Sequence, residues 1–166
     1  MCFKRNRVGL LIRFFLGGLI SLLIFKTVFI VARVRGHSMK PALYDGDYVL
    51  CIRIPHGRNT LSQTIKKLLL CRRAIVLVRP PWIVNRVQIK RIAGVAGDFR
   101  NWGRRYPDSD LQQIPDHHIF LVGDASQAIT TTTLPTDSRL FGPCLSSAVI
   151  GRAIFRFWPL VYLKPK

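Results

Sequence analysis

Acidic residues are scarce in this chain of 166 residues, which carries 8 Asp and Glu against 26 Lys and Arg. The resulting net charge of +18 favours an anionic partner, either nucleic acid or anionic lipid headgroups. Because 49% of the residues are hydrophobic, the chain is large and apolar enough for one folded domain and an anchor. Composition alone does not choose between the two partners.

Several motifs that would identify other classes of protein are missing. No two of the four cysteines form a C-x-x-C pair, which argues against zinc and thiol redox sites, although their even number leaves disulfides open. His117 and His118 are adjacent, so their side chains point apart on a strand or helix, and we expect no metal and no cofactor. Helix-turn-helix, zinc-finger and RNA-binding aromatic signatures are also absent, so we expect no nucleic-acid partner.

A Gly-x-Ser-x-Gly turn is missing as well, and no local pattern supports a Ser-His-Asp triad. What the chain does have is an apolar stretch, Val8–Ala32, behind a short basic segment at residues 1–7. As a helix, this stretch would be roughly 37 Å long, enough to cross a hydrocarbon core of about 30 Å. We therefore expect a transmembrane anchor at residues 8–32, with Lys26 reaching toward the headgroups. The alternatives are a cleaved export signal, an interfacial helix and a buried core helix.

Beyond the anchor, residues 33–166 are expected to form one domain rich in strands. A basic amphipathic helix or a loop is expected at 61–73, a turn at 94–98 and a short hairpin insertion at 99–116. Apolar or alternating runs predict strands at 48–54, 74–79, 84–92, 119–122 and 149–157. The predicted fold class is mainly β, an antiparallel sheet or barrel-like domain with one N-terminal transmembrane helix.

Four short motifs follow the apolar stretch in a fixed order. They are Ser38-Met39-x-Pro41-x-Leu43, Gly46-Asp47-x-Val49, Lys90-Arg91-x-x-Gly94-x-x-Gly97-Asp98, and Gly123-Asp124 followed by Asp137-Ser138-Arg139-x-x-Gly142. Each motif alone is weak evidence. Together, over residues 8–158, they resemble the type I signal peptidases, including the related inner-membrane peptidases of mitochondria.

The resemblance implies a serine–lysine dyad, with Ser38 as nucleophile and Lys90 as general base. Lysine has an ordinary pKa near 10.4, so the site must keep Lys90 neutral, and burial on a core-forming strand does this. Arg91 is then expected to point the opposite way and to carry a solvated charge. The resemblance also implies that the Ser38 backbone N–H stabilises the oxyanion. Asp137 and Arg139 are expected to form a supporting ion pair.

The same resemblance implies a membrane-anchored endopeptidase that removes leader peptides from exported or membrane-inserted precursors. Val34, Met39, Leu43 and Ile89 are the candidate substrate-binding residues, in pockets that accept small side chains at positions −1 and −3 of the cleavage site. The expected partners are such precursor proteins and membrane lipids, with the oligomeric state open. The expected location is a bacterial plasma membrane, with the N-terminus inside and the domain outside the cytoplasm. The mitochondrial inner membrane is the alternative.

Some positions depart from the pattern of the signal peptidases. Ala42 and Ala125 replace the usual Thr and Asn, and Gly36 occupies a position where some members carry a hydroxyl group. The hydroxyl that orients Lys90 is not evident, with Thr133 and Thr136 as candidates. These departures fit a specialised peptidase with few substrates or an inactive relative. A non-catalytic, basic, membrane-anchored protein that binds anionic lipid or nucleic acid is the alternative function. A soluble self-cleaving repressor is disfavoured by the apolar N-terminus.

Overall fold

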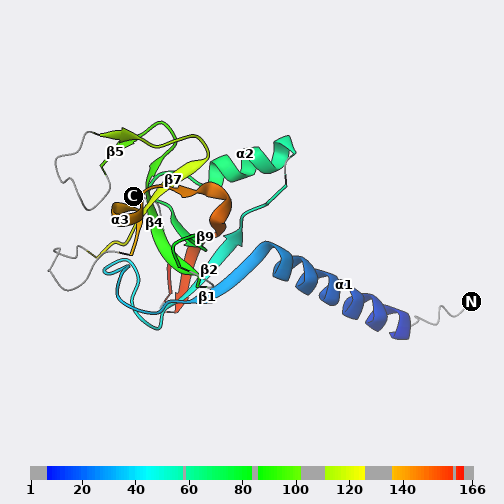
Figure 1. Ribbon diagram of the computed structural model, residues 1–166. Coiled ribbons are helices and arrows are strands. Elements are labelled where there is room, and N and C mark those ends of the chain that lie inside the picture. Colours follow the sequence, from blue (N-terminus) through cyan, green and yellow to red (C-terminus); the bar gives the residue numbers. More distant parts are fainter. Residues whose placement is uncertain are drawn as a thin grey trace, which may run out of the picture.

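The computed structural model describes residues 7–57, 59–83, 86–101, 111–125, 136–158 and 160–162. Its first element is helix α1 (Arg7–Val28), which projects alone from the folded domain (Figure 1). Within it, Gly9–Val28 is long and apolar enough to cross a membrane, with a mean hydropathy of 1.9, and none of it is buried by the rest of the protein. These properties fit the expected membrane anchor.

The helix ends four residues earlier than the sequence indicated. Residues 29–32 were expected to continue the anchor to Ala32, but they belong to strand β1 (Phe29–Arg33). Strand β1 pairs antiparallel with β2 (Tyr48–Arg53), from Phe29 opposite Ile52 to Arg33 opposite Tyr48. The β-branched residues of this segment suit a strand as well as a helix, so hydropathy alone did not mark the boundary.

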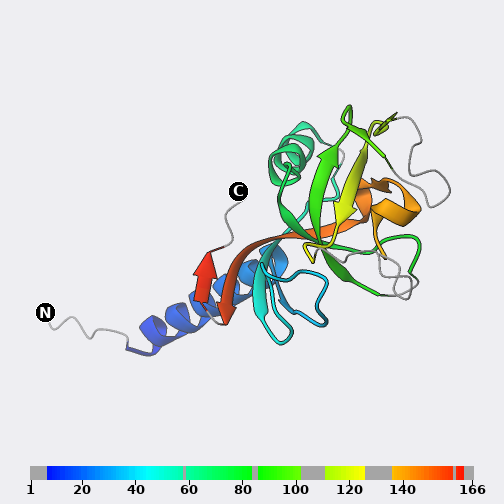
Figure 2. The same ribbon diagram turned by 90° about the vertical axis from the view of Figure 1, so that its left-hand side faces the viewer.

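The domain is built on one curled antiparallel sheet, which confirms the predicted fold class (Figures 1 and 2). Its strands follow the order β1-β2-β9-β3-β4-β7-β8, and β10 pairs with β9. The remaining strands of this sheet are β3 (Ile75–Val78), β4 (Gln88–Val95), β7 (His118–Val122), β8 (Cys144–Leu145), β9 (Val149–Trp158) and β10 (Leu160–Tyr162). Because β4 pairs with β7 as far as Val95, the turn expected from Gly94 begins two residues later.

Shorter elements lie outside the sheet. They are helix α2 (Thr60–Leu69), helix α3 (Ser138–Phe141), a 3-10 turn at Ser146–Ala148, and a two-stranded ribbon of β5 (Phe99–Arg100) and β6 (Gln112–Gln113). The ribbon lies in the segment expected to form a hairpin insertion, of which residues 102–110 are outside the described residues. Cys51, Cys71 and Cys144 are free thiols.

Strand β3 separates two apolar clusters because all four of its residues are buried. Val76 and Val78 pack in one cluster, whereas Ile75 and Leu77 pack in the other. The second cluster also contains Val34, Met39, Leu43, Val49, Cys51 and Ala153. It therefore holds the loop between β1 and β2, where the first two sequence motifs lie, against the sheet.

Candidate active site

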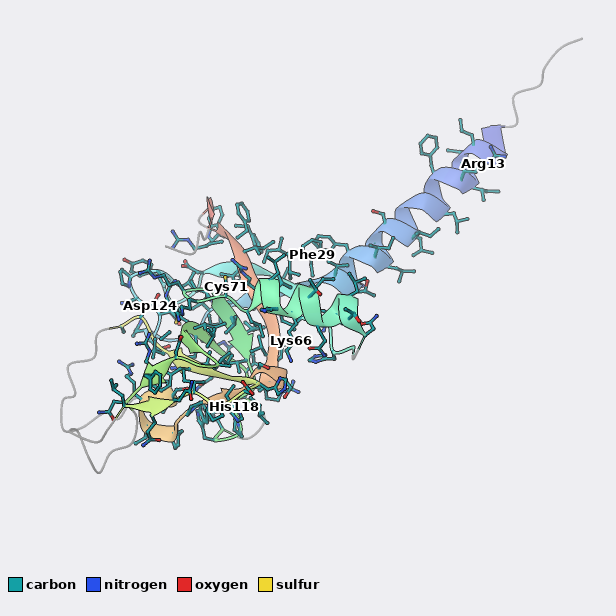
Figure 3. All side chains as sticks on the ribbon, turned by 90° about the horizontal axis from the view of Figure 1, so that it is seen from above. Arg13, Phe29, Lys66, Cys71, His118 and Asp124 are labelled. Atoms are coloured by element: carbon teal, nitrogen blue, oxygen red, sulfur yellow. The ribbon has the colours of Figure 1, made fainter. Side chains whose placement is uncertain are left out.

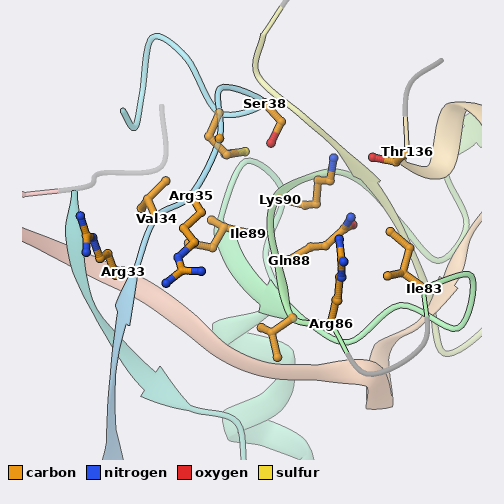
Figure 4. Close-up of a pocket in the computed structure, with 13 residues that line it drawn as sticks. Arg33, Val34, Arg35, Ser38, Ile83, Arg86, Gln88, Ile89, Lys90 and Thr136 are labelled. Atoms are coloured by element: carbon orange, nitrogen blue, oxygen red, sulfur yellow. The ribbon is translucent and has the colours of Figure 1, made fainter. Parts of the chain in front are cut away.

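Most of the predicted site residues line one pocket of about 420 Å³ beside strand β4 (Figure 4). Its wall contains Arg33, Val34, Arg35, Gly36, Ser38, Met39, Ile83, Arg86, Val87, Gln88, Ile89, Lys90 and Thr136. Ser38, Lys90, Val34, Met39 and Ile89, all predicted to act in the site, thus meet in one place. Leu43 is not among the lining residues, and its side chain is fully buried in the second apolar cluster.

The position of Lys90 follows from the alternation of strand β4. Lys90, Ile92 and Gly94 occupy the buried face of the strand, and Ile92 packs in the first apolar cluster. The side chain of Lys90 is therefore drawn inward with its apolar neighbours, and Lys90 is only 4% exposed. Burial lowers the pKa of Lys90 below its ordinary value, with Asp137 opposing this shift and Arg139 adding to it.

Asp137 and Arg139 form the expected ion pair, with 2.7 Å between Asp137 Oδ2 and Arg139 Nη2. Burial would raise the pKa of Asp137, but hydrogen bonds from Arg139 and from the Gly123 N–H lower it below its ordinary value. Ser138 adds a second link to β7, since its hydroxyl accepts a hydrogen bond of 2.9 Å from the Leu121 N–H. The last sequence motif is therefore attached to the strand beside β4, where its carboxylate influences Lys90.

Ser38 is held through its backbone by the segment that follows β7. The Ala125 N–H donates a hydrogen bond of 3.0 Å to the carbonyl of Ser38. Gly123 lies so close that an added Cβ would be 2.6 Å from the same carbonyl oxygen. Because any side chain at this position would displace Ser38, the Gly123-Asp124 motif owes its glycine to a close backbone approach.

The loop that carries Ser38 is closed at its base by Asp47 of the second motif. The Asp47 carboxylate accepts hydrogen bonds from the Tyr44 N–H at 2.8 Å and from Arg156 at 3.0 Å. Its backbone carbonyl accepts another from the Val34 N–H at 2.7 Å. With Asp47 only 5% exposed, these contacts fix the two ends of the segment from Val34 to Asp47 relative to each other.

Arg91 differs from the sequence-based expectation. It does point away from Lys90, but it does not carry a solvated charge, since it forms a two-pronged ion pair with Asp124. The distances from Arg91 Nε and Nη2 to the carboxylate oxygens are 2.6 and 2.5 Å. A third bond, of 2.7 Å, reaches the carbonyl of Arg73. Both members of the Gly123-Asp124 motif therefore support the site. Gly123 lies against Ser38 in the loop, and Asp124 binds Arg91, the neighbour of Lys90 in β4.

The mouth of the pocket is cationic. Arg33, Arg35 and Arg86 are exposed and line it, and no acidic residue is among its described lining residues. In the view of Figure 4 the Lys90 amine lies between the hydroxyl groups of Ser38 and Thr136. Thr136 therefore stays a candidate to orient Lys90, whereas Thr133 is outside the described residues.

Gly36 lines the pocket in a backbone conformation that explains its residue type. Its φ of +87° lies in the left-handed region, and its N–H donates a hydrogen bond of 2.6 Å to Asp45 Oδ1. A serine or threonine in this conformation would be strained. The site therefore lacks the extra hydroxyl that some signal peptidases carry here, for a reason that lies in the backbone.

Comparisons with known proteins show which family the chain is similar to. The family described as "Signal peptidase, peptidase S26" matches residues 7–99, which include the first three motifs. The "Mitochondrial ATP-independent inner membrane protease subunit 1b" of Arabidopsis thaliana is 33% identical over 134 residues, covering 78% of this chain and 70% of the relative.

Two relatives from other organisms are also similar. The "Mitochondrial inner membrane protease subunit 2" of Saccharomyces cerevisiae is 31% identical over 135 residues, covering 78% of this chain and 68% of the relative. The protein of the same name from Danio rerio is 30% identical over 150 residues, covering 88% and 73%. With the motifs, the curled sheet and the apolar N-terminal helix, these matches establish that the chain belongs to the signal peptidase family, peptidase S26.

Proposed function

We propose that this protein is a membrane-anchored serine endopeptidase that cleaves leader peptides from precursor proteins through Ser38 and Lys90. The observation that carries the proposal is the burial of Lys90, 4% exposed, in the wall of the pocket that also contains Ser38. A lysine acts as a base only when it is neutral, and burial shifts its pKa in the required direction.

The proposed reaction has two stages. In the first, Ser38 Oγ attacks the scissile carbonyl carbon while Lys90 Nζ accepts the hydroxyl proton. The tetrahedral intermediate collapses, the C–N bond breaks, and the leaving amine takes the proton from Lys90. In the second, Lys90 removes a proton from water and the water oxygen attacks the ester carbon. The bond from that carbon to Ser38 Oγ then breaks, Ser38 Oγ takes the proton back from Lys90, and the carboxylic acid product leaves.

The negative oxygen of each intermediate needs a donor. Among the described residues the Ser38 backbone N–H forms no hydrogen bond, which supports its assignment as the oxyanion donor. Asp137 and Arg139 act through position and charge: Asp137 joins the start of α3 to the residue after β7, and both residues adjust the pKa of Lys90. Val34, Met39 and Ile89 provide the apolar wall against which small substrate side chains would lie.

We place the protein in the mitochondrial inner membrane. This alternative is favoured over a bacterial plasma membrane by the relatives, which are named as mitochondrial inner membrane proteases from a plant, a yeast and a fish. The basic segment before the apolar helix supports an N-terminus on the matrix side, and the peptidase domain then lies on the opposite side.

The test uses the full chain in detergent and an internally quenched peptide with alanine at positions −1 and −3. Ser38→Ala and Lys90→Met are each expected to lower kcat/KM by about 10⁴-fold or more without unfolding the domain. Ser147→Ala and Lys67→Met, at exposed positions outside the pocket, serve as matched controls. Near-normal cleavage by Lys90→Met would refute the dyad.

A further inference from the structure

Helix α2 presents an apolar stripe that the rest of the domain does not cover. Leu61, Ile65 and Leu68 are spaced by four and three residues and so lie on one face. They are 67%, 37% and 73% exposed, and no residue of α2 is buried. Contact with the domain is made instead by Leu69, which packs against the first apolar cluster, and by Leu70 after the helix. The stripe is therefore free to contact another molecule.

The helix lies on the side of the domain from which α1 departs (Figures 1 and 3). A hydrogen bond of 3.1 Å from Arg53 Nε to the carbonyl of Thr27 fixes the end of β2 beside the last turn of α1. Only residues 54–59 separate Arg53 from the start of α2. Seven fully extended residues span at most about 25 Å, so α2 begins within that distance of Arg53.

The charge of α2 indicates what the stripe contacts. The helix contains Lys66 and Lys67 and no acidic residue. No ion pair of either lysine is found among the residues that the structure describes. A helix with an apolar face and lysines beside it is typical of helices that lie in the headgroup layer of a bilayer. Each basic residue near an anionic lipid surface strengthens such binding about fivefold.

We propose that α2 lies on the anionic surface of the membrane that α1 crosses, with Leu61 and Leu68 in the headgroup layer and the lysines at the phosphates. This inference rests on α1 spanning that bilayer. It gives the domain a second point of attachment, at some distance from the first. Two points limit rotation about the end of α1, so they set which way the pocket faces relative to the membrane surface.

The experiment measures amide hydrogen exchange of the full chain reconstituted in vesicles. Vesicles of phosphatidylcholine alone are compared with vesicles that also contain phosphatidylglycerol. Exchange in residues 62–70 is expected to be about tenfold slower in the anionic vesicles, because lipid contact opposes local opening of the helix. Exchange in β3 and β9, at the centre of the sheet, should be the same in both.

Variants separate the lipid contact from other causes. The double variant Leu61→Asn with Leu68→Asn should abolish the slower exchange of residues 62–70 in anionic vesicles. The double variant Lys66→Gln with Lys67→Gln should remove most of this difference between the two kinds of vesicle. Leu145→Asn is the matched control, because Leu145 is 52% exposed on β8, at the opposite edge of the sheet from β1. Thermal unfolding in detergent shows that each variant is folded.

Three outcomes would overturn the proposal. Exchange at α2 could be equal in the two kinds of vesicle, or it could be unaffected by the double leucine change. The slowing of exchange could also depend on the density of protein in the vesicle rather than on the lipid charge. In that case a second copy of the chain, and not the membrane, would contact the stripe. The peptidase proposal is tested apart from this, because Ser38→Ala should keep the protection and the α2 variants should keep cleavage in detergent.

Discussion

Ser38 and Lys90 share a pocket but are held by different parts of the fold. Lys90 lies within a strand that is paired on both sides, and its environment is made by the packed face of the sheet. Ser38 lies in a loop between β1 and β2, and its backbone is held at one carbonyl by the segment after β7. The sheet therefore controls the basicity of the amine, and the loop controls the position of the hydroxyl.

This difference separates two observable quantities. A change that moves Ser38 should lower the maximum rate and leave the pH midpoint of kcat/KM where it was, because Lys90 is untouched. A change in the charges around Lys90 should move the midpoint and alter the maximum rate little. The first two predictions below compare displacement of Ser38 with removal of the Lys90 amine, and the last moves the midpoint alone.

Among the changes that compare the loop with the sheet, the largest effect is expected from Gly123→Ala. The new methyl group would lie 2.6 Å from the Ser38 carbonyl, so the serine loop must shift. A displacement of about 1 Å at a reacting group costs on the order of 100-fold in rate. We therefore expect kcat to fall about 100-fold, with an unchanged pH midpoint, in a peptide-cleavage assay across pH.

Gly17→Ala is the control for this change, since open space surrounds Gly17 in the apolar helix. It should cleave the peptide at the wild-type rate. If Gly123→Ala also keeps full activity while remaining folded, the segment after β7 does not position the nucleophile. The claim that contacts of the loop control the position of the Ser38 hydroxyl would then be wrong.

The next effect is a gain of stability in Lys90→Met. Because the folded-state pKa of Lys90 lies below the ordinary value of 10.5, the unfolded chain binds a proton that the folded chain releases in the interval between them. Stability contributed by this group is therefore lower at neutral pH and is restored as pH rises toward 10.5. Replacing a buried ionisable group by an apolar one of similar length should stabilise the fold by about 1 kcal/mol.

Urea unfolding in detergent at neutral pH and near the ordinary lysine pKa measures this gain. The advantage of Lys90→Met over the wild type should shrink at the higher pH, whereas the exposed Lys67→Met should show none at either. If Lys90→Met is no more stable than the wild type at neutral pH, burial of the Lys90 amine does not lower the free energy of unfolding.

Sequence reasoning selected Ser38 and Lys90, which the structure brings to one pocket, because each leaves a local signal. Ser38 and Lys90 lie in short motifs, and the apolar residue two positions after Lys90 shares its face of a strand, which predicts burial. The fold class followed from several short apolar runs with turns between them. Val34, Met39 and Ile89, chosen as near neighbours of the dyad in sequence, do line the pocket.

What sequence reasoning missed depends on contacts between distant segments. No pattern places Gly123 against the Ser38 carbonyl or pairs Arg91 with Asp124, because each contact joins residues from different strands or loops. Leu43 was chosen for the pocket on its closeness to Ser38 in sequence, but the loop turns its side chain into the core. The end of α1 was missed because residues 29–32 are as apolar as the helix before them and are fixed as a strand only by their pairing with β2.

The smallest effect, and the most specific for the sheet side of the comparison, is expected from Arg139→Gln. Arg139 lowers the pKa of Lys90, and its ion pair with Asp137 offsets the opposing influence of that carboxylate. Without the guanidinium both changes raise the pKa of Lys90, so the rising limb of kcat/KM should move to higher pH. Because Arg139 is partly exposed, the loss at neutral pH should be modest, roughly threefold. Arg72→Gln, which breaks an ion pair with Asp98 outside the pocket, should leave the pH dependence of kcat/KM unchanged. A shift toward lower pH in Arg139→Gln would show that another group, rather than Lys90, accepts the proton from Ser38.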